Sequence, residues 1–529
     1  MKKYLIGLIF ISGTVLGQTS NELAQRLEKH IGFLADDKLE GRRTGTEGEK
    51  LAYTYIMNEF KKAGLEPMGD NQTYIQAFEL NEGKQMVPEL FLQADSKKLN
   101  LDKDFFPLAF SANSTASATG QEIHYLDMAT VMEENKHNPH FDVYTFLSND
   151  IEKAAEAGKK IYVIHNTGNL SDDLRFDPKN KTNTSTIPVV YVQAQAFQSF
   201  QSAKKIQWDI RLKEKTSTGH NVVGFINNHA THSIILGAHY DHLGYGEDHN
   251  SLYVGKERMI HNGADDNASG TSALIELGYW LKKSGLKNYN YILVAFSGEE
   301  LGLYGSKYFT ENAGIDLKNA NYMINMDMVG RLDSVDKDIT IGGFGTSPYW
   351  SEIIRTDDDF FKIKVDSSGS GPSDHTSFYR KDMPVLFFFT GTHSDYHKPS
   401  DDAEKINVKG TAAIVKYIQN ILSKTNSQPK LAFTKTREVQ MGTSSFKVSL
   451  GIMPDYTYSG AGVRVDGIID DRPAQKAGIQ TGDVLLKLGT HPFTDVMSYM
   501  RALNKFNKGE TTTVEFKRGE EVIKSQVTF

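Results

Sequence analysis

The sequence contains no cysteine among its 529 residues. This absence excludes disulfide bonds, thiol nucleophiles and thiolate metal sites, so any metal must be held by histidine, aspartate and glutamate. A basic block is also missing, and the net charge of -7 is spread along the chain. We therefore expect no nucleic-acid partner and no binding to an anionic membrane surface, and we expect small molecules or peptides as partners.

Long apolar runs are also absent. The N-terminus consists of Met1 and two lysines, an apolar run (4–11) and mostly small residues up to Gly17. The apolar run is too short to span a bilayer, and the three parts together are typical of a secretory signal. We predict a signal peptide at residues 1–17 and an exported protein, periplasmic or secreted, with no stable membrane anchor after cleavage.

The remaining chain changes character several times. Helical spacing of apolar residues between 21 and 60 predicts two helices, and short β-branched runs up to residue 216 predict a strand-rich insert. Strands then alternate with helices, which predicts an α/β domain with a mixed, mostly parallel sheet covered on both faces by helices. The expected divisions are a signal peptide (1–17), the α/β domain in two parts (18–77 and 217–424), the insert (78–216), a linker (425–437) and a C-terminal domain (438–529).

Polar residues follow the predicted strands of the α/β domain. Because the carboxyl ends of parallel strands meet at one edge of a sheet, we expect these side chains to converge there. In chain order they are His239 and Asp241, Glu299 and Glu300, Asp327, and Tyr396 and His397.

Imidazoles and carboxylates without thiolates suit zinc, with manganese or cobalt as substitutes. Two metals that share a bridging carboxylate need about five ligands. Five residues supply that number: His239, Asp266, Glu300, Asp327 and His397. Glu299 is then left as a base that takes a proton from a water of lowered pKa and passes it to a leaving amine. We therefore expect two Zn²⁺ per chain.

Five motifs resemble, in order and spacing, the co-catalytic two-zinc aminopeptidase family of exopeptidases. They are His239-Tyr240-Asp241, residues 263–270, Gly298-Glu299-Glu300, Asn325-Met326-Asp327 and Tyr396-His397. The N-terminal segments 39–42 and 61–65 extend the resemblance over the whole α/β domain. It implies the zinc exopeptidase fold, with His239 and Asp327 on one zinc, Glu300 and His397 on the other, and Asp266 as the bridge.

The resemblance also implies roles around the metals. Glu299 matches the general acid/base, Asp241 the carboxylate that orients His239, and Tyr396 a tyrosine that steadies the oxyanion in some members. Asp265 is the rival of Asp266 as the bridge, but the family motif places the ligand at the second aspartate and a cis peptide after it.

Several other residues have a structural interpretation beside a functional one. His242 is the rival of His239 and is expected to be a loop or cleft-wall residue. Asp374 and His375 either line the cleft or form a helix cap and a loop hydrogen bond. Three further histidines are expected to be solvated: His249, His261 and His393.

The two added domains also resemble known modules. The insert is similar to a protease-associated domain through residues 104–108, 158–164 and 187–192. The resemblance implies a domain that covers the cleft or selects substrates by length, or one that acts only as a stabilising lid. The C-terminal domain resembles a bacterial-protease PDZ domain through residues 449–452 and 472–485. A C-terminal peptide ligand would bind there by strand addition, or the domain is regulatory or structural.

The sequence therefore predicts an exported two-zinc metallo-exopeptidase, an aminopeptidase that hydrolyses N-terminal residues from peptides. Within the same family, a carboxypeptidase or a glutaminyl-cyclase-like enzyme is the alternative. Outside it, the alternative is a non-catalytic peptide-binding protein that acts through its PDZ domain.

Overall fold

The computed structural model describes residues 12–529 except 137–140, 169–171, 173, 179, 181, 249, 254, 256, 356–357, 437–447, 455–457, 459, 469–471, 495 and 504. Most of the expected signal peptide and the start of the expected C-terminal domain lie outside the described residues. The chain divides into two compact units, residues 1–79 with 218–441 and residues 80–217 with 442–529. Among the described helices, none combines the length and apolarity needed to cross a bilayer.

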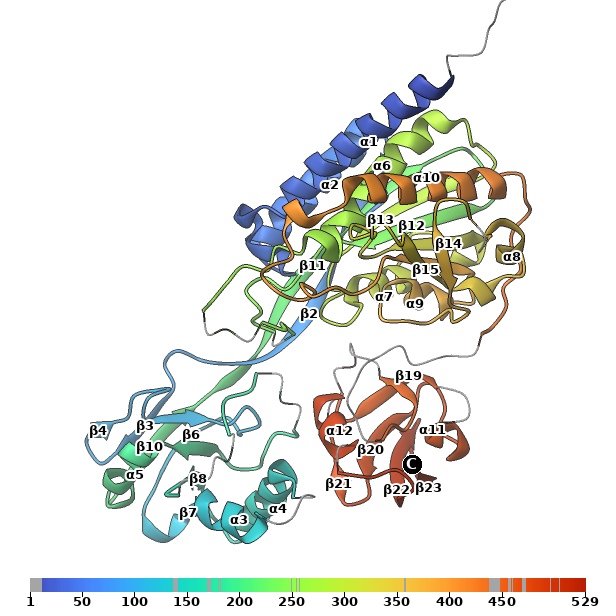
Figure 1. The fold of residues 1–529 in the computed structure, drawn as a ribbon. Helices are drawn as coiled ribbons and strands as arrows, with labels where there is room; N and C mark the ends of the chain where they lie inside the picture. The colour runs from blue at the N-terminus through green and yellow to red at the C-terminus, as the bar shows by residue number, and fades with distance from the viewer. Residues whose placement is uncertain are drawn as a thin grey trace, which may run out of the picture. The chain divides into compact units, whose positions relative to one another are not determined.

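A mixed sheet forms the centre of the first unit (Figure 1). Its four middle strands run parallel. Outside them, β11 runs antiparallel to β13 and β15 runs antiparallel to β17. The order is β1 (Glu66–Pro67), β11 (Leu212–Ile226), β13 (Asn290–Phe296), β12 (Ser233–His239), β14 (Ala320–Met326), β17 (Val385–Phe389), β15 (Asp338–Gly342) and β16 (Lys362–Val365), with β2 (Ile75–Met86) paired to β11. This confirms the predicted mixed, mostly parallel α/β sheet.

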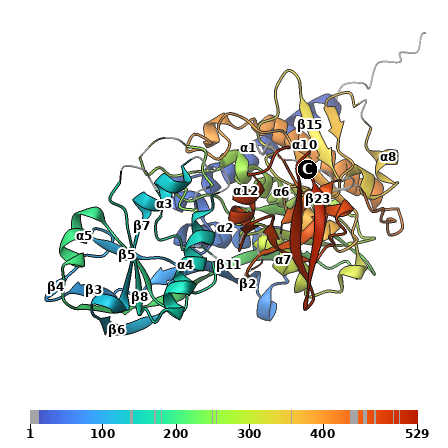
Figure 2. The same cartoon turned by 90° about the horizontal axis from the view of Figure 1, so that it is seen from below.

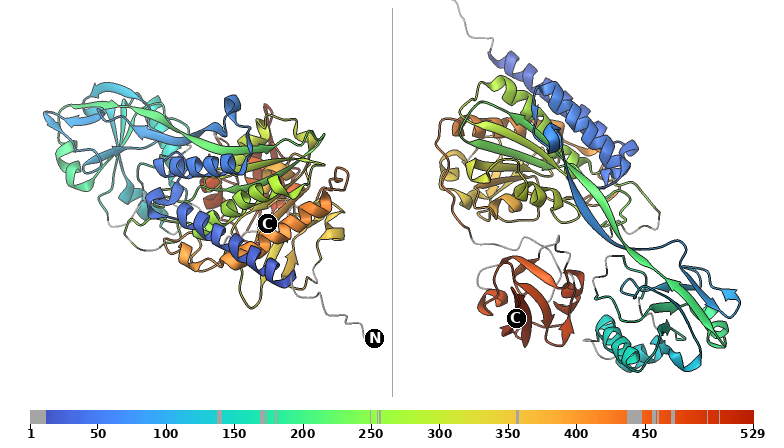
Figure 3. Two further views of the ribbon diagram at one scale, coloured as in Figure 1. Left: turned by 90° about the horizontal axis from the view of Figure 1, so that it is seen from above. Right: turned by 180° about the vertical axis from the view of Figure 1, so that it is seen from behind.

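Helices cover both faces of this sheet, as Figures 1 and 3 show. Along β12, Ile234 and Leu236 belong to one core and Ile235 to another, because successive strand residues point to opposite faces. The first core includes residues of α1 (Ser12–Leu34), α2 (Glu47–Ala63), α6 (Gly270–Ser284), α8 (Trp350–Ile353) and α10 (Val408–Thr425). The second includes residues of α7 (Tyr304–Glu311) and α9 (His375–Tyr379). The sheet is therefore buried on both sides, which explains its continuous apolar strands.

In the second unit, the part up to residue 217 has two four-stranded sheets. One joins β4 (Lys97–Lys98), β3 (Phe91–Ala94), β10 (Ile206–Ile210) and β6 (Ser114–Ala118), and the other joins β5 (Phe105–Pro107), β9 (Val189–Val192), β8 (Ile161–His165) and β7 (Ile123–Asp127). Three helices accompany them: α3 (Met128–Asn135), α4 (Val143–Glu156) and α5 (Ala194–Gln201). The strands agree with the sequence pattern, which did not indicate the helices.

The C-terminal part of that unit has its own core, which includes Leu485, Phe516 and Tyr499. Its strands are β18 (Ile452–Pro454), β19 (Val463–Ile468), β20 (Val484–Leu488), β21 (His491–Pro492), β22 (Thr511–Arg518) and β23 (Glu521–Thr528), with helices α11 (Pro473–Lys476) and α12 (Val496–Leu503). Figure 2 shows the long β22–β23 hairpin beside the C-terminus. The antiparallel sheet with two short helices is consistent with a PDZ domain.

Candidate metal centre

The carboxyl ends of the parallel strands bring the candidate residues together. His239 is the last residue of β12, a strand whose seven residues are all buried. Glu299 and Asp327 follow the neighbouring strands β13 and β14, and the loop after β17 carries His397. A fully packed strand fixes the backbone at its end, so these side chains start from rigid positions.

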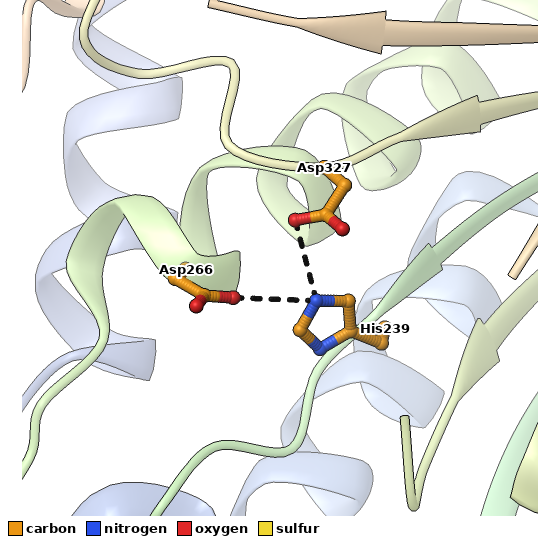
Figure 4. Close-up of side chains that lie close together, drawn as sticks. All are labelled: His239, Asp266 and Asp327. Atoms are coloured by element: carbon orange, nitrogen blue, oxygen red, sulfur yellow. Dashed lines mark ion pairs between the residues drawn. The ribbon is translucent and has the colours of Figure 1, made fainter. Parts of the chain in front are cut away.

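Three side chains form the first group: His239, Asp266 and Asp327 (Figure 4). The Nε2 atom of His239 lies 3.3 Å from Asp266 Oδ1 and 3.3 Å from Asp327 Oδ1. One N–H cannot point well at two oxygens at once, whereas a cation between the three atoms would interact with all of them.

A second group lies on the other side of Asp266. His397 Nε2 is 3.4 Å from Asp266 Oδ2 and 3.3 Å from Glu300 Oε2. Asp266 thus directs one carboxylate oxygen to each group, and the five residues expected as ligands lie in one cluster.

These distances fit zinc. Ligands roughly 2.0–2.1 Å from a tetrahedral zinc ion lie roughly 3.3–3.4 Å apart, which is the distance from the imidazole nitrogen to each carboxylate oxygen in both groups. The donor set of imidazoles and carboxylates is also one that zinc accepts. The residues present therefore fit a metal at each of the two positions.

The charges inside the cluster are strongly coupled. Burial opposes charge on both His397 and Glu300, but their mutual attraction outweighs it. The pKa of His397 is raised to about 11, chiefly by Glu300, and the pKa of Glu300 is lowered to about 2 by His397 and His242. Likewise, the carboxylates around His239 raise its pKa well above the ordinary value, and both imidazoles hold the pKa of Asp266 well below its ordinary value. The site therefore stabilises positive charge between its carboxylates.

Glu299 lies at the edge of this cluster. Its Oε2 atom is 4.0 Å from His239 Nε2, and its side chain is 11% exposed. Burial raises the pKa of Glu299 well above its ordinary value, and the nearby charges of Glu300 and Asp327 add to the effect. A carboxyl group with a raised pKa beside a cation site has the properties of a general acid/base.

Asp241 connects the ends of β12 and β13. Its Oδ1 atom lies 3.7 Å from His239 Nδ1 and accepts a hydrogen bond from the Glu299 backbone at 3.2 Å, while its Oδ2 atom accepts one from the Glu300 backbone at 3.4 Å. Asp241 therefore contacts the His239 ring and also holds the turn that carries Glu299.

Tyr396 stacks on the ring of His397, with ring centroids 3.9 Å apart. Its phenol is half-buried, and burial together with the charge of Asp266 raises its pKa above the ordinary value. Tyr396 therefore remains a neutral hydrogen-bond donor beside the cluster.

The two neighbouring aspartates have separate surroundings. The Asp266–Asn267 peptide is cis, as expected from the sequence. Asp265 Oδ1 accepts hydrogen bonds from Gly330 N at 2.6 Å and Ser269 Oγ at 3.0 Å, and its Oδ2 atom lies 3.2 Å from His393 Nε2. The expectation that His393 is solvated is therefore wrong, because this side chain is only 13% exposed and its ring contacts buried Asp265.

Two buried residues that the sequence did not single out hold the backbone around Asp266. Asp401 Oδ2 accepts hydrogen bonds from Asp265 N at 2.9 Å and Asp266 N at 3.1 Å. Arg42 donates to Tyr240 O at 2.7 Å and Gly263 O at 3.0 Å, so it links the end of β12 to the segment before Asp266. No local sequence pattern distinguishes these long-range contacts.

Two further histidines, His242 and His261, are buried and contact polar side chains. His242 is buried, and its Nδ1 atom lies 2.7 Å from Glu300 Oε1, whereas His397 contacts the other oxygen, Oε2. The sequence signal that could have indicated this contact is the position of His242 directly after Asp241. His261 was expected to be solvated but is buried, with Nε2 2.7 Å from Ser251 Oγ. His249 lies outside the described residues.

Asp374 and His375 lie at the start of α9 and are both buried. Burial raises the pKa of Asp374 to about 7 and lowers that of His375 to about 3. The His375 ring stacks on Phe387, with centroids 4.4 Å apart, so His375 is part of the packing behind the site. The Asp374 side chain forms no cap hydrogen bond, so the interpretation as a capping side chain is wrong.

Comparisons with known proteins find relatives of two parts of the chain. Residues 221–422 match the model of peptidase family M28, and residues 439–528 match the PDZ domain model. The chain is 28% identical over 271 residues to aminopeptidase YwaD of Bacillus subtilis, a match that covers 48% of this chain and 55% of that protein. It is 31% identical over 171 residues to leupeptin-inactivating enzyme 1 of Streptomyces exfoliatus, which covers 30% of this chain and 37% of that enzyme.

The chain thus spans about half or less of the length of these curated relatives. A solved structure of a zinc aminopeptidase from Bacillus subtilis superposes with a TM-score of 0.44 and 20% identity, covering 77% of this chain and 95% of that one. The family match and the PDZ match cover separate parts of the chain. The chain therefore contains a peptidase family M28 domain at residues 221–422, followed by a C-terminal PDZ domain at residues 439–528.

Proposed function

We propose that the protein is a two-zinc aminopeptidase that releases N-terminal residues from peptides. The observation that carries this proposal is the position of Asp266, whose two carboxylate oxygens face His239 and His397 at 3.3 and 3.4 Å. One carboxylate between two imidazoles is the arrangement that a pair of metals needs. The M28 match over the same residues supports the proposal.

In this proposal, His239 and Asp327 would hold one zinc, Glu300 and His397 would hold the other, and Asp266 would be shared by the two groups. The bound metals would lower the pKa of a water and polarise the scissile carbonyl. Glu299 takes a proton from the attacking water and returns it to the leaving amine. Tyr396 donates its phenol hydrogen to the oxygen on which charge develops.

Three arginines of the first unit bear on the preference for an N-terminal amine over a C-terminal carboxylate. The guanidinium of Arg42 donates to backbone carbonyls, and those of Arg43 and Arg331 form ion pairs with Asp248 and Asp395. These three arginines are therefore engaged by the protein itself, which argues against a role for them in binding a substrate carboxylate.

Export is part of the proposal. With the signal peptide expected at residues 1–17, the activity belongs in the periplasm or outside the cell, where peptides are the available substrates. The PDZ domain would then bind the C-terminal end of a peptide by strand addition.

The test combines metal analysis of the purified protein with hydrolysis of matched peptides that have free or acetylated N-termini. We expect two zinc ions per chain and cleavage of free peptides from their N-terminal end. Cleavage of acetylated peptides at the C-terminal end would refute the aminopeptidase assignment. One zinc per chain with cyclisation of N-terminal glutamine would favour the cyclase-like alternative.

A further inference from the structure

The loop between helices α1 and α2 reaches the candidate active site, although none of its residues is among the proposed ligands. The loop includes a 3-10 helix (Asp37–Arg42) and ends at Thr46, which caps α2. Thr44, inside this loop, is 1% exposed. A buried hydroxyl in a loop requires a partner, and the partners of Thr44 belong to the ends of two central strands.

Thr44 forms three close contacts with these strand ends. Its Oγ1 atom donates to Asp241 Oδ2 at 3.1 Å, accepts from Gly298 N at 3.0 Å and lies 3.1 Å from Ser297 Oγ. Gly298 has φ +72, a left-handed conformation that aims its N–H at Thr44. The single hydroxyl therefore links the turn after β12 to the turn after β13.

The number of protons available supports the donor and acceptor assigned to each hydrogen bond of Thr44. A threonine hydroxyl has one proton to donate, and the carboxylate of Asp241 is a stronger acceptor than a serine hydroxyl. The proton of Ser297 is used elsewhere, because Ser297 Oγ donates to Glu49 Oε1 at 2.7 Å. Glu49 is buried in α2 and also accepts from His220 N at 3.0 Å, so the network is anchored on a helix and on β11.

The network ends at the residues that do the proposed chemistry. Asp241 accepts hydrogen bonds from the backbone N–H groups of Glu299 and Glu300 and lies beside the His239 ring. Loss of the Thr44 hydroxyl would remove one of the two hydrogen bonds that Asp241 Oδ2 accepts and, at the same time, the acceptor of the Gly298 N–H. The turn that carries Glu299 would then lose two of the contacts that set its position.

We propose that Thr44 is a positioning residue that fixes Asp241 and the Ser297–Glu300 turn, and thereby sets both zinc affinity and the reach of Glu299. This inference rests on the proposed two-zinc peptidase function. Thr44 is not among the proposed ligands, and its hydroxyl contacts Asp241, Gly298 and Ser297, so its effect passes through these residues. Partners of this kind typically change metal affinity or activity by about 10–100-fold when they are mutated.

The experiment compares Thr44→Val, Thr44→Ala and Thr44→Ser in the full-length zinc-loaded protein. A matched control is Thr310→Val, since Thr310 is also buried but its hydroxyl bonds to Lys307 O in its own helix at 2.9 Å. Zinc affinity is measured by competition with a chelating indicator. The kcat and KM are measured at saturating zinc with a free peptide, and Tm reports folding.

We expect Thr44→Val and Thr44→Ala to bind zinc about 10–100-fold more weakly and, at saturating zinc, to lose about 10–100-fold in kcat with little change in KM. Thr44→Ser should restore both values toward wild type, and Thr310→Val should change neither. If Thr44→Val does not fold, the comparison of Thr44→Ser with Thr44→Ala still isolates the hydroxyl.

Equal zinc affinity and kcat in Thr44→Ala, Thr44→Ser and the wild type would overturn the proposal. So would a Thr44→Ser variant as impaired as Thr44→Ala. If the wild-type protein bound zinc but cleaved no peptide, the proposed function would fail, and the zinc affinities would still decide the role of Thr44.

Discussion

His239 and His397 contact opposite oxygens of one carboxylate, that of Asp266, at 3.3 and 3.4 Å. The two histidines are far apart in the sequence, and their elements meet only in the folded sheet. The carboxylate between them joins two groups of side chains, each with the spacing of zinc ligands. Most of the expected behaviour of the protein follows from this relationship.

The first prediction concerns the bridge itself. Asp266→Ala removes an oxygen from both groups at once, so we expect the variant to lose both zinc ions and its peptidase activity. His239→Ala removes a ligand from one group and should weaken zinc at that position first. Zinc content per chain, measured by elemental analysis after dialysis, checks both results. Two retained zinc ions in Asp266→Ala would contradict the assignment of the bridge.

The neighbouring aspartate should behave differently. Asp265 is buried against His393, Ser269 and the Gly330 backbone, so Asp265→Ala removes the acceptor of the Gly330 N–H and the carboxylate beside His393 Nε2. We expect a loss of about 3 kcal/mol in the free energy of unfolding, measured by urea denaturation. The folded variant should still bind two zinc ions. A folded Asp265→Ala protein without zinc would show that the two aspartates have been assigned in the wrong order.

The proposed acid/base gives a third prediction. Glu299→Gln keeps the shape of the side chain but cannot accept or return a proton, so kcat should fall by about 10²–10⁴-fold. Both zinc ions should remain, because Glu299 is not a proposed ligand. Glu300→Gln is the matched control and should weaken zinc binding. Full activity of Glu299→Gln would refute the mechanism.

Zinc binding should release protons. The carboxylates raise the pKa of His397 to about 11 and that of His239 well above its ordinary value, so both rings bind protons near neutral pH in the metal-free protein. Zinc requires neutral rings, and each ring must therefore lose its proton. Titration calorimetry in two buffers of different ionisation enthalpy should show about two protons released per two zinc ions.

The raised pKa values of His397 and His239 also predict how zinc affinity and stability change with pH. Zinc affinity should rise with pH, because the competing protons become scarcer. In the metal-free protein, the stability that the charged histidines contribute is fully present below their ordinary pKa of 6.5 and is lost as the pH rises through about 11. Zinc affinity that does not change with pH would contradict the buried, carboxylate-paired state of these rings.

Much of the fold was predictable because its signals are local. The continuous apolar strands β12, β13, β14 and β17 and the periodic helices α6 and α10 lie where the sequence pattern places them. The sequence pattern does not predict helix α4, although Leu147, Ile151 and Ala154 are buried at helical spacing. The β-branched runs on either side of this segment favour strands.

The candidate site was predictable to the extent that its residues follow strands. Side chains from distant loops were not, because only the folded chain brings them into contact. Asp401 reaches the Asp265 and Asp266 backbone from a loop far along the chain, and Thr44 reaches Asp241 from the N-terminal part. The sequence does not predict the contact of His242 with Glu300, because it does not show toward which side of the loop the His242 ring points.

The central claim is that two zinc ions share Asp266. Crystals of the zinc-loaded protein, measured on both sides of the zinc absorption edge, test it directly. The account predicts two anomalous peaks per chain, one between His239 and Asp327 and one between Glu300 and His397, with Asp266 in contact with both. A single peak, or a peak held by Asp265 in place of Asp266, would contradict it.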